Sequence, residues 1–385
     1  MDEEYKPGEP GSYLAPERSL KRGWSLRRFL AGLVIVFLLS YILFIIPLPY
    51  YIFKPGSAEE IHPMVKVTQG DSPEQGAFLL TTVGVMDSNV FSYFWAKLFK
   101  EEIRPKTSVK QADETDQEYT QRQVYKMISS QSSAIQAAYN KLGIPYHIKD
   151  EGVMVLHVVK GMPAEKVLQV GDYLLEIDGL SLTDGEKLVN YLKTKKAGDT
   201  VKVTFRRGDQ VKQETVSLAI LPAASPAAGQ SSEPPRVGIG FTFSQVQSVQ
   251  ADDEGKQVTI QAGEIGGPSA GLMFSLEIYN QLVPEDITKG YRVAGTGEID
   301  ELGHVGVIGG IQHKVVAADR EGAEIFFAPK DLYPAAGQTF QPVLNTTDAK
   351  RQAEKIGTKM KVVSVGTMEE ALDYLKNLPP KGSKG

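Results

Sequence analysis

Residues 266–272 read GGPSAGL and place Ser269 among neighbours that have little or no side chain. The glycines and proline before Ser269 do not readily extend a helix backwards, whereas the residues after it repeat apolar side chains at helical spacing. We therefore expect Ser269 at or near a helix N-terminus, where unpaired backbone N–H groups and the positive end of the helix dipole collect. The expected apolar face consists of Ala270, Leu272, Met273, Leu276, Tyr279 and Leu282.

This position allows two interpretations of Ser269. The serine could simply cap the helix beside a tight glycine turn. It could instead be a nucleophile, because the N–H groups at a helix N-terminus suit an oxyanion that develops during attack on a carbonyl. In that case Gly267, Pro268 and Ala270 border the position of the oxyanion and the approach of the substrate backbone.

A serine nucleophile needs a nearby base, and histidine is the first candidate. Residues 267–271 fit the pattern G-x-S-x-G, and Asp300 with His304 or His313 follows in the order that the corresponding hydrolase fold uses. That fold requires a strand immediately before the serine. Residues 261–265 are a weak strand candidate because they are short and two glycines follow them.

The second candidate base is Lys314, which ends the segment GGIQHK at residues 309–314. The apolar spacing around Lys314 predicts a helix that begins after the two glycines and ends at Gly322. Burial in such a helix lowers a lysine pKa from about 10.4 toward neutrality, where the amine can accept the serine proton. Spacing alone does not distinguish this lysine from a solvated surface charge.

The composition excludes several other classes of protein. The 385 residues are 42% hydrophobic and 23% charged, which allows two or three domains with buried cores. A net charge of -5 provides no broad basic field, so we expect no nucleic acid partner. There is no cysteine, and the five histidines show no metal-ligand spacing, so we expect neither thiol catalysis nor a metal or other cofactor.

An apolar segment near the N-terminus predicts a transmembrane helix. Residues 29–46 read FLAGLVIVFLLSYILFII without a charge, and we place the span at residues 29–49, where a proline stop follows. The preceding tail, residues 1–28, is expected to be disordered and ends in a basic cluster, which places it in the cytoplasm and the remaining chain outside. A cleaved signal peptide or a buried core helix would be the alternatives. The basic cluster consists of Arg18, Lys21, Arg22, Arg27 and Arg28.

Residues 50–142 are expected to form a connector with a strand hairpin, from residues 64–67 and 78–85, and a helix near residues 115–142. Residues 143–221 change to short strands and tight turns. A linker rich in proline and small residues is expected at residues 222–235.

The segment GMPAEKVLQVGDYLLEIDG at residues 161–179 resembles a PDZ domain, and the resemblance covers roughly eighty residues. Such domains bind an extended peptide as an added strand beside a helix. A candidate for the carboxylate-binding loop of this family is Leu142-Gly143-Ile144. The alternative is a spacer or lid that binds no peptide.

Residues 236 to about 376 resemble the proteolytic domain of Lon proteases. We therefore expect a Lon-type domain at residues 236–378, followed by a short tail at residues 379–385. The resemblance implies that Ser269 is the nucleophile, that Lys314 is the general base and that Thr296 hydrogen-bonds the lysine. The matching motifs are GGPSAGL, Ala294-Gly295-Thr296-Gly297-Glu298-Ile299, Gly303-His304-Val305, Ile308-Gly309-Gly310-Ile311 with Lys314, Ala317 and Ala318, and Phe327-Ala328-Pro329. No role is assigned to Glu298. Gly266 stands where many Lon proteases have an acidic residue.

No GxxxxGK[ST] phosphate loop occurs in the sequence, so the ATPase module of cytoplasmic Lon is not expected. The order of anchor, PDZ domain and Lon-type domain is similar to that of membrane-bound PDZ-containing Lon-like proteases of Gram-positive bacteria. This resemblance implies an α+β multidomain protein that cleaves extended or locally unfolded polypeptides at the outer face of the cell membrane without ATP. Its expected partners are a polypeptide substrate and the lipid bilayer. The resemblance also implies a possible homo-oligomer, because Lon-type domains often assemble into rings. The alternative is a non-catalytic PDZ scaffold with a degenerate Lon-type domain.

Overall fold

The computed structural model describes residues 26–70, 75–111, 114–222, 236–263, 265–335 and 337–382. Most of the expected N-terminal tail, nearly all of the expected linker and the last three residues of the C-terminal tail lie outside the described residues.

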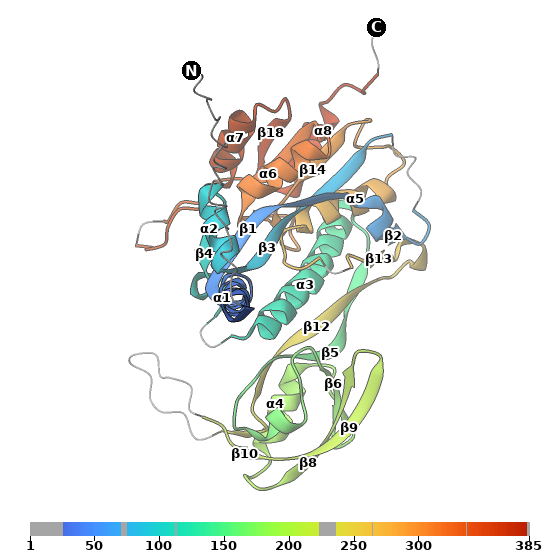
Figure 1. The fold of residues 1–385 in the computed structure, drawn as a ribbon. Coiled ribbons are helices and arrows are strands. Elements are labelled where there is room, and N and C mark those ends of the chain that lie inside the picture. Colours follow the sequence, from blue (N-terminus) through green and yellow to red (C-terminus); the bar gives the residue numbers. More distant parts are fainter. Residues whose placement is uncertain are drawn as a thin grey trace, which may run out of the picture.

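The larger part of the fold is built on a mixed six-stranded sheet in the order β18-β17-β14-β3-β1-β4 (Figure 1). Strands β3, β14, β17 and β18 run parallel to one another, whereas β1 runs antiparallel to both β3 and β4. Helices supply the crossovers that parallel strands require, since α6 joins β14 to β17 and α7 joins β17 to β18. The strands are β1 (Pro47–Glu60), β3 (Ala77–Asn89), β4 (Glu102–Pro105), β14 (Arg292–Gly295), β17 (Ile325–Pro329) and β18 (Lys361–Val365).

Alternating side chains on these strands bury both faces of the sheet. Phe78 and Phe327 pack into a cluster with α5, α3 and α8, whereas Leu79 and Phe326 pack into a second cluster with α6 and α7. The helices are α3 (Asp116–Leu142), α5 (Gly271–Leu282), α6 (Ile311–Arg320), α7 (Asn345–Ile356) and α8 (Met368–Lys376). The predicted helix that begins after Gly309-Gly310 and carries Lys314 is confirmed.

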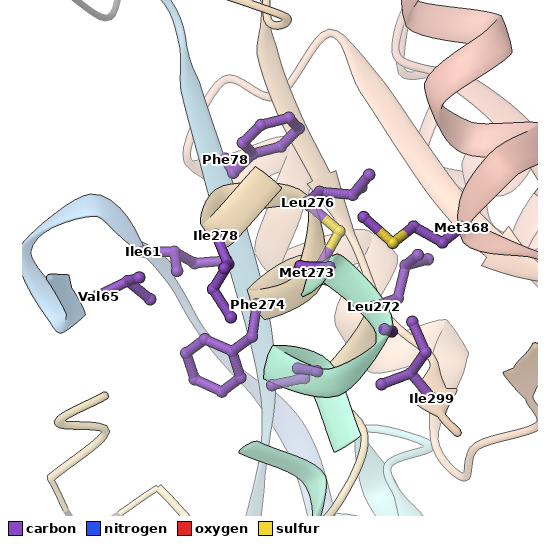
Figure 2. Packing of buried hydrophobic residues seen from close by; sticks show 14 of the residues in the cluster. Ile61, Val65, Phe78, Leu272, Met273, Phe274, Leu276, Ile278, Ile299 and Met368 are labelled. Carbon is purple, nitrogen blue, oxygen red and sulfur yellow. The ribbon is translucent and has the colours of Figure 1, made fainter. Parts of the chain in front are cut away.

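Helix α5 lies at the centre of the larger cluster, and ten of its twelve residues are buried. Figure 2 shows its side chains surrounded by Phe78 of β3, Met368 of α8 and the neighbouring turns of α3. Gly271 permits the close approach, because a Cβ there would lie 2.7 Å from Ser130 Oγ of α3. The prediction that α5 has a single apolar face was therefore incomplete, because the helix is enclosed between the sheet and α3.

The expected connector at residues 50–142 is not a separate unit. Its strands β1 and β3 pair with each other, and β3 also pairs with β14, so this segment supplies half of the central sheet. The predicted hairpin is wrong as well, because β2 (Val65–Val67) pairs with β13 (Val258–Ile260). Strand β1 was not predicted from the sequence because prolines interrupt its strand pattern. Its pairing with β3 shifts register at two places.

The smaller part of the fold contains the sheet β12-β5-β6-β8-β9, with β7 beside β6 and helix α4 packed against it (Figure 1). Strands β5 and β12 pair along their length and run together toward α3. The elements are β5 (Tyr146–Val158), β6 (Tyr173–Ile177), β7 (Leu180–Ser181), α4 (Gly185–Lys193), β8 (Thr200–Arg207), β9 (Gln210–Ser217) and β12 (Phe241–Ala251).

The predicted boundary at residue 236 is wrong. Strand β10 (Ala219–Ile220) pairs across the expected linker with β11 (Val237–Gly238), and Ile239 lies in the core of the smaller domain. The first part of β12 then completes that domain's sheet. Composition marked the linker but carried no information about pairing between the segments on either side of it.

The apolar N-terminal segment forms α1 (Leu26–Phe44), in which no residue is buried. By length and composition α1 is a candidate membrane span, and a signal sequence would have the same features. The predicted span at residues 29–49 extends too far, because Pro47 already begins β1. Helix α2 (Val90–Leu98) contacts α1 at the end of the β1–β3 pair (Figure 1).

Candidate active site

The expected site residues come from three elements that meet at the carboxyl end of β14. Ser269 precedes α5, Thr296 directly follows β14, and Lys314 lies in the first turn of α6. Because α5 and α6 cover opposite faces of the sheet, the end of β14 is the place where their N-termini converge.

The three side chains contact one another. Lys314 Nζ lies 2.6 Å from Ser269 Oγ and 2.9 Å from Thr296 Oγ1. The Thr296 hydroxyl donates to the backbone oxygen of Ser269 at 2.9 Å. Thr296 therefore orients the lysine amine and also holds the loop that carries the serine.

Burial controls the charge of the lysine. Lys314 is 3% exposed, and desolvation lowers the pKa of its amine from 10.5 to about 7. At neutral pH a large fraction of the amine is thus unprotonated. A neutral amine beside a serine hydroxyl can accept its proton, as a nucleophilic site requires.

Helix α3 supports the serine loop from the other side. The Gly267 N–H donates to the Gln123 backbone oxygen at 2.9 Å, and Ser130 Oγ donates to the Pro268 oxygen at 2.8 Å. Gly267 also has a φ of +90°, a conformation that strongly favours glycine. No local sequence signal identifies the two α3 residues, because more than 130 positions separate Ser130 from Pro268.

Gly267 is expected to border the oxyanion and the substrate backbone, and its own N–H is already used, because it donates to the Gln123 backbone oxygen. Pro268 has no N–H to donate. Within the described residues, the backbone N–H groups of Ser269 and Ala270 donate no hydrogen bond, and both residues line the same cleft. These two groups can therefore donate to an oxygen atom bound in the cleft.

The cleft beside Ser269 has a volume of about 810 Å³. Strand β3 forms one wall through Thr82, Val83 and Val85, and Gly310 lies at the start of the wall formed by α6. Glu298 also lines the cleft, where partial desolvation raises the pKa of its carboxyl. The space can hold an extended polypeptide segment.

The histidine-based interpretation is wrong. His304 Nδ1 lies 2.7 Å from Asp300 Oδ2, and His313 Nε2 lies 2.8 Å from Glu102 Oε2. Ser269 instead contacts Lys314, and none of the described residues between 261 and 270 forms a strand. In the part of the chain that the structure describes, no three His, Cys, Asp or Glu side chains gather as a metal site.

A second concave surface lies on the smaller domain, between α4 and the start of β12. It encloses about 650 Å³, and β12 is the edge strand of its sheet. An edge strand beside a helix is the arrangement that accepts a peptide as an added strand. The surface is lined mainly by apolar groups, and two lysines are among the lining residues: Leu188, Val189, Leu192, Lys193, Lys195, Ile239, Phe241 and Phe243.

The residues Leu142-Gly143-Ile144, which were expected to form a carboxylate-binding loop, do not line this groove. Gly143 ends α3 in the left-handed conformation, and Ile144 is buried in the central cluster. The loop beside the groove is Gly238-Ile239-Gly240, with Gly240 at a φ of +90°. The two glycines immediately before a strand were the signal that could have identified it.

Comparisons with known proteins agree with this division. Residues 140–218 match the PDZ domain family, and residues 257–376 match the family of Lon protease (S16) C-terminal proteolytic domains. A Lon protease from Fervidobacterium nodosum is 34% identical over 111 residues, which cover 29% of this chain and 12% of that protein. A Lon protease from Clostridioides difficile is 28% identical over 205 residues, which cover 51% of this chain and 21% of that protein.

Among solved structures, the PDZ domain of an SdrC-like protein from Listeria monocytogenes is 32% identical, covers 24% of this chain and 87% of that domain, and has a TM-score of 0.21. The chain thus matches only about a fifth or less of the length of the two Lon proteases above.

Proposed function

Because the chain contains a PDZ domain and a Lon-type proteolytic domain, we propose that it is a serine endopeptidase in which Ser269 is the nucleophile and Lys314 the general base. The observation that carries this proposal is the 2.6 Å contact between Lys314 Nζ and Ser269 Oγ at a buried amine. The alternative of a non-catalytic PDZ scaffold is not favoured, because all three expected site residues are present and in contact.

The reaction follows from the arrangement of the groups. Neutral Lys314 takes the proton of Ser269 Oγ while Oγ attacks the peptide carbonyl carbon, and the N–H groups of Ser269 and Ala270 stabilise the oxyanion. The protonated amine then donates to the leaving nitrogen, which departs as the new N-terminus and leaves an acyl group on Oγ. Lys314 next accepts a proton from water, whose oxygen attacks the ester carbon. The bond between that carbon and Oγ then breaks, the acid leaves, and the protonated amine returns its proton to Oγ.

Covalent labelling tests this function. A fluorophosphonate probe should form an adduct that peptide mass spectrometry locates on Ser269, and prior labelling should block cleavage of casein in the absence of ATP. The experiment also tests ATP independence, for which the absence of a phosphate-loop motif from the sequence is the support. Cleavage of casein that continues after complete labelling of Ser269 would contradict the proposal.

The cleavage rate is expected to rise with pH through a midpoint near 7, because only the neutral form of Lys314 accepts a proton and burial lowers its pKa to about 7. We expect kcat/KM to increase about tenfold per pH unit below the midpoint and to level off above it. The measurement is kcat/KM for a soluble peptide between about pH 5.5 and about pH 9. A profile that is flat across this range would exclude an amine base with this pKa.

Thr296→Val is expected to lower kcat by roughly 10- to 100-fold, because the variant keeps the shape of the side chain but loses the hydrogen bonds to Lys314 Nζ and to the Ser269 oxygen. A shift of the pH midpoint should accompany the loss, since Thr296 no longer accepts from the amine. Thr259→Val, at an exposed position in β13, is the matched control. If Thr296→Val leaves both kcat and the midpoint of the pH profile unchanged, the threonine does not position the lysine for the reaction.

We further propose that α1 anchors the enzyme in a membrane, with the N-terminus in the cytoplasm and the catalytic domain outside the cell. Support comes from the apolar length of α1, its lack of buried residues and the basic cluster around its N-terminal end. Flotation of the full chain with lipid vesicles after carbonate washing tests the anchor. A chain of unchanged length that stays in the soluble fraction would contradict it.

The groove between α4 and β12 is proposed to recruit polypeptide substrates to the proteolytic domain. Val189→Glu should raise KM for casein by about 3- to 30-fold with little change in kcat, because a charge in an apolar groove weakens peptide binding away from the reacting groups. Val211→Glu is the control, at an exposed position on β9 that does not line the groove. Equal KM values for the two variants would leave the groove without a role in recruitment.

A further inference from the structure

Helix α2 exposes a large apolar surface. Its only buried residue is Ala96, while Phe91, Phe94, Trp95 and Leu98 are 43% to 73% exposed, and Phe99 directly after the helix is 57% exposed. We call these five exposed residues the aromatic surface. An exposed patch of this kind marks a region that contacts another apolar phase.

The aromatic surface is continuous with the end of α1. The Phe44 ring of α1 lies 4.9 Å from the Phe91 ring, and the series continues from Phe91 to Trp95 at 5.7 Å and from Trp95 to Phe99 at 4.7 Å between ring centroids. The Asn89 side chain, which caps α2, also donates to the Phe44 oxygen at 3.0 Å. Helix α2 is thus held against the C-terminal end of α1, at Phe44.

We propose that α2 lies in the outer interface of the lipid bilayer, with the aromatic surface inserted among headgroups and upper acyl chains. This inference rests on the proposed membrane anchor. Tryptophan and phenylalanine on one face of a short helix suit that region, and Lys97 and Lys100 beside them can reach lipid phosphates. The ring series makes the bilayer the favoured occupant over a second copy of the chain, because the lipid that surrounds α1 extends to the same residues.

This second membrane contact restrains the orientation of the cleft. The base of α2 is joined to β3, whose residue Asn89 pairs with Pro47, the first residue of β1 and the third after the end of α1 (47 minus 44). Val85 lines the cleft four positions earlier on the same strand (89 minus 85), about 13 Å away at the usual rise per residue. Two contacts at this end of the β1–β3 pair would therefore present the cleft to segments of polypeptide that lie close to the membrane.

Depth-dependent fluorescence quenching tests the inference in the full chain. The sequence contains two tryptophans, so Trp24→Phe leaves Trp95 as the only one. The protein is reconstituted in phosphatidylcholine and phosphatidylglycerol vesicles that carry a spin label at carbon 5 or carbon 12 of the acyl chain. We expect Trp95 to be protected from iodide and to be quenched at least about twofold more by the shallow label than by the deep one.

Two matched substitutions locate the contact. Leu98→Glu, at a residue that is 73% exposed, should reduce shallow quenching of Trp95 by about half or more, whereas Leu302→Glu, at a residue that is 72% exposed, should leave it unchanged. Neither variant should alter cleavage of soluble casein. Equal quenching in both variants would overturn the inference.

The remaining outcomes separate this inference from the anchor. Protein that floats with the vesicles while Trp95 stays open to iodide and unquenched by lipid would retain the anchor and overturn the interfacial contact. Protection from iodide that disappears in nanodiscs holding one chain each would show that a second copy covers the aromatic surface. Protein that fails to float would overturn the anchor and this inference together.

Discussion

Ser269→Ala is expected to lower kcat/KM for casein or a soluble unstructured peptide by at least about 10³-fold. The variant removes the proposed nucleophile, the hydroxyl that lies 2.6 Å from the buried Lys314 amine, so no acyl-enzyme can form. The residual rate would come from substrate binding and the oxyanion donors acting on water. The measurement is the initial rate of peptide cleavage at pH 8 or so, above the lysine midpoint.

Ser275→Ala is the matched control, because Ser275 is buried in α5, the helix that follows Ser269, and its hydroxyl donates to the Leu272 backbone oxygen. This control should keep wild-type activity within about threefold and change the stability by roughly 1 kcal/mol. Activity that survives in Ser269→Ala, with the variant correctly folded, would require another nucleophile.

Lys314→Met is expected to be as inactive as Ser269→Ala while unfolding at a higher temperature than the wild type. Methionine fills a similar volume without an amine, so the base disappears together with the cost of burying an ionisable group. We expect a gain on the order of 1–3 kcal/mol at neutral pH. Thermal unfolding followed by circular dichroism, combined with the cleavage assay, measures both effects.

The stability difference between Lys314→Met and the wild type is expected to depend on pH. Burial lowers the pKa of Lys314 to about 7, whereas the amine titrates near 10.5 when unfolded, so folding releases a proton between these values. Wild-type stability from this group therefore rises with pH across that window and is lowest below pH 7. The advantage of Lys314→Met should be largest at or below pH 7 and should shrink toward pH 10.

Lys350→Met, at an exposed position on α7, is the control for the lysine substitution. It should leave activity unchanged and shift stability by no more than about 0.5 kcal/mol, because its amine is already solvated. A Lys314→Met variant that is inactive but clearly less stable than the wild type would mean that the lysine supports the fold rather than the chemistry.

Much of the candidate site could be predicted from the sequence. Glycine and proline before Ser269 indicated where α5 begins, and the glycines before Lys314 indicated the start of α6. These signals are local, because backbone conformation near glycine and proline depends on adjacent residues. The resemblance of the motifs then named Thr296, which the structure brings to the same amine.

The supporting residues were beyond the reach of such signals. Gln123 and Ser130 hold the serine loop through one backbone and one side-chain hydrogen bond, and neither stands in a recognisable motif. The strands before α3 appeared to form a connector, yet β1 and β3 complete the sheet on which β14 ends. Strand patterns reveal which face is apolar but not which strand becomes the neighbour.

From the sequence it could therefore be predicted which residues form the candidate site, where their helices begin and which segment is apolar enough to cross a membrane. All three depend on residues that are near one another in the chain. The low pKa of Lys314, the α3 contacts to the serine loop and the position of the groove beside Gly240 required the folded protein. Each depends on burial or pairing between segments that are distant in the chain, and the free energies of those contacts exist only once the sheet and its covering helices have assembled.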